Sequence, residues 1–101
     1  MAIVITHVVL MKLQDENDLA EAISRLRSMV GKIPTLLSLK CGTDALNAGG
    51  GDHVFDLALV SEHPDAQGLA EYQVHPVHLE VMEWLSPRRI GRAVVDSLDF
   101  G

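Results

Sequence analysis

The segment IVITHVVLMK, residues 3–12, decides the fold, because it is a predicted strand with two apolar faces. Side chains alternate between the faces of a strand, so each face can be read from every second residue. A strand that is apolar on both sides is expected to be covered on both sides. One face carries Ile3, Ile5, His7, Val9 and Met11, and the other carries Val4, Thr6, Val8 and Leu10.

The rest of the chain predicts three more strands and two helical regions. The strands are expected at residues 35–42, 53–61 and 90–98, and the helices at 15–31 and 64–85. Proline at position 76 breaks the second helical region in two. The order is therefore β-α-β-β-α-β. With right-handed crossovers, it predicts a ferredoxin-like α+β fold, a four-stranded antiparallel sheet with the helices on one face. We expect a single domain over residues 1–101.

Short-range signals predict where the helices begin. Asp18 and Glu21 have the spacing of a capping box at the start of the first helix. Proline suits the first position of a helix, where its missing N–H is not needed. We therefore expect Pro64 and Pro76 to open the two later helices, with His75 as the cap in front of Pro76.

The sheet face away from the helices is the reason to expect a dimer. In the predicted fold this face carries Val4, Val8, Leu10, Ala58 and Val60, and no further segment is available to cover it. A contiguous apolar patch is rarely left in water. The same face of a second copy is the simplest cover, so the sequence predicts a homodimer with sheet packed on sheet.

Charge and cysteine content exclude several classes of function. Eight basic and fourteen acidic residues give a net charge of −6, which argues against binding to nucleic acid or to an anionic membrane surface. No apolar run approaches the ~20 residues that span a bilayer. Cys41 is the only cysteine, so no intrachain disulfide is possible and a cytoplasmic location is expected.

Polar side chains on apolar faces are the candidates for chemistry. His7, Tyr72 and His78 each lie on a face that is otherwise apolar, whereas His53 and His63 are expected to be solvated. Burial lowers the pKa of a histidine, which keeps the ring neutral and able to act as a base. A nearby tyrosine can donate a hydrogen bond to a developing oxyanion. The alternative is that all three are buried groups with backbone partners.

A metal site and a nucleophilic cysteine are less well supported. His75 and His78 have i, i+3 spacing, but no third ligand lies near them in sequence. As a nucleophile Cys41 would need a partnering base and an electropositive setting, and neither is visible in the sequence, so a buried strand thiol is expected. We therefore expect no metal site and no cofactor.

Four segments carry a resemblance to a known family: THVVLMKL (6–13), FDLALV (55–60), AEYQVHPVH (70–78) and AVVD (93–96). The most specific is the run from Tyr72 to His78, Y-x-x-H-P-x-H, directly after a helix. Together they resemble the stress-responsive A/B barrel domain family, often called Dabb. The resemblance spans almost the whole chain and implies a dimeric α+β barrel.

The resemblance also implies a pocket and an activity. A similar plant enzyme closes a linear polyketide by aldol condensation, with a histidine and a tyrosine at the positions of His78 and Tyr72. By this comparison His78 is a general base and Tyr72 its partner. The substrate is expected to be a small hydrophobic carbonyl compound that undergoes cyclisation, isomerisation or cleavage. The expected substrate-binding residues are His7, Val9, Ile23, Leu26, Leu57, Leu59, His75 and Val81.

The pocket lining departs from that plant enzyme. Leu57 stands in place of a histidine and Arg89 in place of a tryptophan, so a different substrate is expected. Two other functions remain open. The chain could be a non-catalytic stress-response or assembly protein, or a module that binds a small ligand without converting it.

Overall fold

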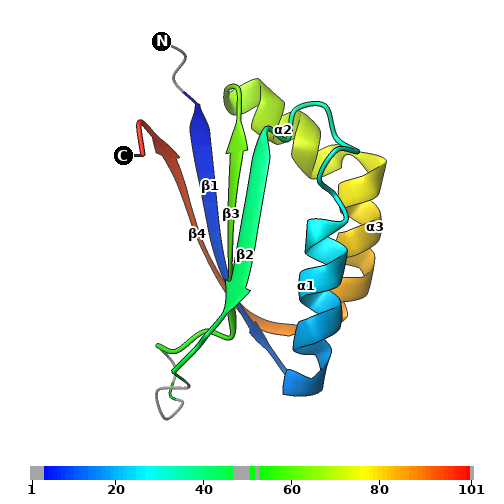
Figure 1. Cartoon of the computed structure of the whole chain (residues 1–101), viewed down its shortest axis with the longest axis vertical. Helices are drawn as coiled ribbons and strands as arrows, with labels where there is room; N and C mark the ends of the chain where they lie inside the picture. Colours follow the sequence, from blue (N-terminus) through cyan, green and yellow to red (C-terminus); the bar gives the residue numbers. More distant parts are fainter. Residues whose placement is uncertain (1–3, 47–50, 52, 101) are drawn as a thin grey trace.

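In the computed structural model, which describes residues 4–46, 51 and 53–100, four strands and three α-helices follow the predicted order (Figure 1). Strand β4 ends the described fold, and short 3-10 turns lie before α1 and before β4. The bounds are β1 Ile5–Leu13, α1 Leu19–Arg27, β2 Ser38–Thr43, β3 Leu57–His63, α2 Ala66–Val74, α3 Pro76–Leu85 and β4 Arg89–Leu98; the 3-10 turns are Glu16–Asp18 and Ser86–Arg88.

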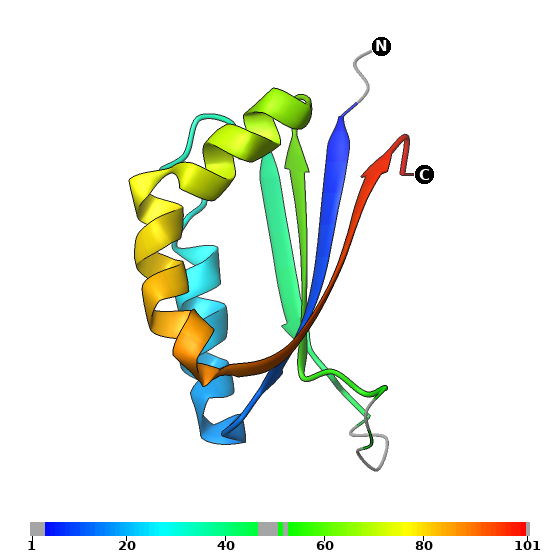
Figure 2. The same cartoon turned by 180° about the vertical axis from the view of Figure 1, so that it is seen from behind.

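The sheet has the order β2-β3-β1-β4, and every neighbouring pair is antiparallel. The central strand β1 pairs with β3 from Ile5↔His63 to Met11↔Leu57. All three helices lie on one face of this sheet, as both cartoon views show (Figures 1 and 2). The predicted ferredoxin-like α+β fold is confirmed.

The hydrophobic core lies between the sheet and the helices. Strand β1 contributes Val9, Met11 and Leu13, which confirms the predicted assignment of its faces. The amphipathic helix α1 packs the stripe that its periodicity predicts onto this face. The remaining core members are Ala22, Ile23, Leu26, Met29, Ile33, Leu36, Leu57, Leu59, Leu69, Tyr72, Val81 and Leu85.

The other side of the sheet is covered by no helix of the described chain. We call it the open face. The register places Ala93 and Val95 of β4 beside Leu10 and Val8 of β1, so the apolar surface extends across three strands. Val95 is 61% exposed. The open face consists of Val8, Leu10, Ala58, Val60, Ala93 and Val95. Val4, which was predicted on this face, lies just before β1, and Ile3, which was predicted on the opposite face, lies outside the described residues.

The helix starts agree only in part with the predictions. The capping box at Asp18 is wrong, because the Asp18 side chain makes no cap hydrogen bond. Asp15 takes this role three residues earlier, where its Oδ1 accepts from the backbone N–H of Asn17 at 2.9 Å. Asp15 therefore caps the 3-10 turn, and α1 follows directly after this turn. Helix α1 ends at Arg27, before the predicted residue 31, and Gly31 in the turn that follows adopts a φ of +82°, a left-handed conformation that favours glycine.

Pro64 is also not the first residue of its helix. Helix α2 begins at Ala66, and the Asp65 carboxylate caps it by accepting from the N–H of Gly68 at 2.7 Å. A proline cannot supply such an acceptor, so the aspartate sets the start. The second start is as predicted: Pro76 is the first residue of α3, and Nδ1 of His75 accepts from the N–H of Val77 at 3.1 Å.

No helix in the described ranges is long and apolar enough to cross a membrane.

Candidate functional site

Four aromatic side chains from four different elements meet between the sheet and the helices. They are His7 of β1, His63 of β3, Tyr72 of α2 and His78 of α3. The Tyr72 ring lies at the centre, with its centroid 4.6 Å from the rings of both His63 and His78 and 6.3 Å from that of His7. The structure therefore brings together the three residues singled out by the sequence and adds a fourth.

The prediction that His63 is solvated is wrong. Its side chain is fully buried, because β3 continues to residue 63 and the strand alternation points this residue inward. The ring is held at both nitrogens. Nδ1–H donates to the carbonyl of Thr35 at 3.0 Å, and Nε2 accepts from the hydroxyl of Ser61 at 2.9 Å. Burial lowers the pKa of His63, so the neutral ring in this tautomer is favoured.

His78 has one ring nitrogen in a hydrogen bond and one with no hydrogen bond to the residues that the structure describes. Its Nδ1–H donates to the carbonyl of Gln73 at 3.0 Å, which leaves the lone pair of the neutral ring on Nε2. Burial lowers the pKa of His78, and coulombic interactions, that with Arg92 among them, lower it further. The direction agrees with the prediction from its position on an apolar helix face.

Tyr72 is, like His63, a fully buried polar group of the cluster. Its side chain is fully buried, and burial raises its pKa to about 12. Among the described residues, its hydroxyl has no hydrogen-bond partner. A buried hydroxyl without a partner is uncommon and carries a desolvation cost. Tyr72 is therefore a neutral phenol whose hydroxyl proton has no acceptor in the described part of the chain.

His7 is held by the neighbouring strand. Its Nδ1 contacts the carboxylate of Asp96, which lies directly opposite His7 in the register of β1 and β4. This contact orients the ring.

A cavity of about 250 Å³ opens beside this cluster, between the sheet and helices α2 and α3. This volume lies just below the ~300–1,000 Å³ of sites for drug-sized ligands. Its walls combine an apolar part, made by β1, β3 and α3, with a polar end. The lining residues are His7, Val9, Met11, Leu59, Tyr72, Gln73, His78, Met82, Ser86, Arg89 and Arg92.

The other residues expected to bind substrate lie elsewhere. His75 caps helix α3 and does not line the cavity. The remaining four are buried members of the core that leave no surface in the cavity: Ile23, Leu26, Leu57 and Val81.

Sequence reasoning missed several residues that line the cavity, Arg92, Met11 and Met82 among them. Arg89 was noted only as a departure from the related enzyme. A signal was present in the i, i+4 spacing of His78 and Met82, which places both on one face of α3. In the described part of the chain, no group of three or more His, Cys, Asp or Glu side chains is placed to hold a metal ion.

The profile of the Stress responsive A/B Barrel Domain family (Dabb) matches residues 5–99. The chain belongs to this family. No curated protein matches the sequence.

Solved structures with this Dabb fold include two proteins described as dimeric, ferredoxin-like and of unknown function. One from Thermobifida fusca YX is 25% identical with a TM-score of 0.81, and the match covers 96% of this chain and 92% of that one. One from Bacteroides fragilis NCTC 9343 is 26% identical with a TM-score of 0.79, covering 93% and 94%. The hydroxynitrile lyase of Passiflora edulis shares the fold at 17% identity, with a TM-score of 0.79 and coverage of 94% and 92%.

Proposed function

We propose that this Dabb protein is an enzyme that removes a proton next to the carbonyl group of a small hydrophobic compound. His78 is the general base and Tyr72 its partner. The observation that supports this proposal best is the pairing of two unsatisfied groups at one cavity. One is the Nε2 lone pair of His78, and the other is the buried hydroxyl of Tyr72.

The two groups suit the two halves of an enolisation. As Nε2 of His78 takes the proton, the ring becomes an imidazolium, and the Gln73 carbonyl at Nδ1–H stabilises this charge. The electron pair of the broken C–H bond forms the carbon–carbon double bond of the enolate, and the π pair of the carbonyl group moves onto its oxygen, which accepts a hydrogen bond from Tyr72. A pKa of about 12 fits this role, because the phenol keeps its proton while it donates.

The fate of the enolate depends on the substrate. It can attack a second carbonyl and close a ring, take the proton back at another carbon, or expel a leaving group. These outcomes correspond to a cyclase, an isomerase and a lyase, and none requires a cofactor for the proton transfer. A structurally similar protein from Passiflora edulis is a hydroxynitrile lyase, so the same fold supports lyase chemistry of another kind in that protein.

We further propose that the protein is a cytoplasmic homodimer joined through the open face. Val8, Leu10 and Val60 remain half-buried there and Val95 is largely exposed, so a partner would remove a continuous apolar surface from water. The similar proteins from Thermobifida fusca and Bacteroides fragilis are described as dimeric.

Hydrogen–deuterium exchange tests the base directly, without knowledge of the substrate. Wild-type protein is incubated in D₂O with 2-heptanone and with 4-oxopentanoate, and loss of the α-proton signals is followed by NMR. We expect faster exchange of at least one ketone. His78→Gln and Tyr72→Phe should each reduce the catalysed rate by about 10²–10⁴-fold. His53→Gln, a change at an exposed histidine, should leave the rate unchanged.

Two results would contradict the proposal. One is exchange that persists in His78→Gln. The other is binding of a ketone by the wild-type protein with no catalysed exchange, which would support a binding module without turnover.

A further inference from the structure

Arg89 and Arg92 of β4 both line the cavity, although strand geometry alone would separate them. Residues three apart in a regular strand point to opposite faces. Here the register shifts between Lys12 and Leu13, because Lys12 pairs with Gly91 and Leu13 with Arg89. Ile90 is the extra residue of this bulge.

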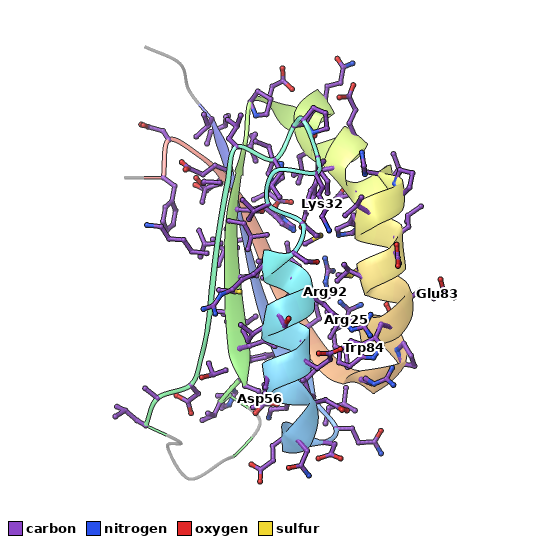
Figure 3. All side chains as sticks on the ribbon, turned by 45° about the vertical axis from the view of Figure 1, so that its right-hand side comes forward. Arg25, Lys32, Asp56, Glu83, Trp84 and Arg92 are labelled. Carbon is purple, nitrogen blue, oxygen red and sulfur yellow. The ribbon has the colours of Figure 1, made fainter. Side chains whose placement is uncertain are left out.

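The bulge places both guanidinium groups on the helix side of the sheet. Arg92 lies opposite Met11, a core residue of β1, and projects toward the helices (Figure 3). Arg89 lies opposite Leu13, which is also in the core. A bulge on an edge strand next to a cavity is a common way to redirect a side chain.

These two arginines lack the partners that the other arginines have. Arg25 pairs with Glu21, Arg88 with Asp18, and Arg27 donates to the carbonyl of Cys41. Arg89 and Arg92 form no ion pair with any residue that the structure describes.

The lining of the cavity contains no carboxylate either, in a chain with a net charge of −6. Asp96, the acidic residue on the same side of β4, is bound to His7. Burial and the charge of Arg92 both lower the pKa of Arg89. The two guanidinium charges therefore repel each other in the cavity. A bound anion would remove this repulsion.

We propose that Arg89 and Arg92 bind the carboxylate of the ligand, which is a small organic acid with an apolar chain. A guanidinium donates two parallel hydrogen bonds to a carboxylate, and two of them can hold both oxygens. Val9, Met11 and Leu59 form the apolar wall for the rest of the molecule. The cavity volume of about 250 Å³ limits this ligand to a short chain.

For the reaction, this inference rests on the proposed function. If that function holds, the substrate is an oxo acid whose carboxylate is anchored at β4 while its carbonyl lies between Tyr72 and His78. Tyr72 and His78 lie in the same cavity lining as the two arginines, so one small molecule can contact both ends.

Binding of hexanoate, compared with its neutral analogue hexanamide, tests the anion site independently of catalysis. Calorimetry gives the affinities, and the methyl signals of Met11 and Met82 report whether the apolar chain enters the cavity. We expect hexanoate to bind at least about tenfold more tightly than hexanamide, the difference typical of a charged hydrogen bond. Arg89→Gln and Arg92→Gln should each lower hexanoate affinity by about tenfold or more and leave hexanamide unchanged.

Matched variants separate this proposal from the proposed function. Arg27→Gln removes the same charge near β2, at the opposite edge of the sheet, and should retain hexanoate binding. His78→Gln should also retain it, although deuterium exchange is lost. If Arg92→Gln fails to fold, Arg92→Lys replaces it in the binding measurement, because lysine keeps the positive charge. This variant should bind hexanoate more weakly than wild type, since lysine lacks the paired donors of a guanidinium group.

Equal affinity for the two probes would overturn the inference. So would hexanoate binding that survives both glutamine changes, or inorganic phosphate that binds as tightly as hexanoate. Each of these results leaves the exchange test of His78 intact.

Discussion

Replacing His63 by leucine tests whether this buried ring serves as a structural link between β3 and the segment before β2. Leucine has a similar volume, but it leaves the hydroxyl of Ser61 and the carbonyl of Thr35 without their partner. Each orphaned group costs about 1–3 kcal/mol, and the apolar leucine recovers part of this loss. We expect His63→Leu to lower the free energy of unfolding by about 2–4 kcal/mol at pH 8.

The pH dependence of this difference in the free energy of unfolding tests whether the neutral His63 ring causes it. The pKa of His63 is lower in the folded protein than the ordinary value near 6.5, because burial disfavours the charged ring. Its stabilising effect is therefore complete above that pH. It is lost as the pH falls from about 6.5 through the folded pKa, since the unfolded chain takes up the proton first. The gap between wild type and His63→Leu should shrink in acid.

Urea unfolding at one fixed protein concentration, at pH 8 and at pH 5.5, measures both effects. His53→Leu is the matched control, because His53 is exposed and its replacement should change neither value. Equal stability of wild type and His63→Leu at pH 8, or a gap that is the same at both pH values, would refute the structural role.

Four further changes test the assembly and the local structure. Val60→Asp places a charge on the open face and should give monomers or insoluble protein; a dimer of this variant in sedimentation would contradict the interface. Pro76→Ala should change stability by less than about 1 kcal/mol in thermal unfolding, because Pro76 opens α3, and a loss near ~3 kcal/mol would contradict this position. Tyr72→Phe should retain the fold and gain up to about 1 kcal/mol, since it removes a buried hydroxyl without a described partner; a large loss would show that a partner exists. Gly31→Ala should cost about 1 kcal/mol at its φ of +82°, and no change in melting temperature would contradict the left-handed turn.

Local patterns were enough to predict the order of the elements. Alternation in residues 3–12 separates the core face of β1 from the open face, and the structure has the same separation. The His75-Pro76 pair predicts both the break between α2 and α3 and the cap of α3. These features depend on neighbours within one or two turns of the chain, and local physics therefore decides them.

The ends of the strands depend on residues far away in sequence. His63 was expected at a loop or helix-start position, because the predicted strand ends at Ser61. Pairing of His63 with Ile5 extends β3 by two residues. Hydrogen bonds with Ser61 and Thr35 engage both ring nitrogens of His63 and offset the cost of burying them. Neither partner can be identified from the sequence around position 63.

The positively charged end of the cavity, formed by Arg89 and Arg92, also depends on pairing with a strand far away in sequence. Here, however, the sequence contains a local indication of the irregularity. A strict alternation over residues 90–98 assigns Arg92 and Arg89 to opposite faces of the sheet. Gly91 lies between them, and a glycine inside a strand often marks a bulge or a close backbone approach. A Cβ at position 91 would lie 3.3 Å from the Cβ of Lys12, so the strands are close at this point. If Gly91 is taken as the site of a bulge, the alternation before it inverts and Arg89 joins Arg92 on the helix side. The pairing of β4 with β1 then decides both the shape of the edge strand and the charge that a ligand meets in the cavity.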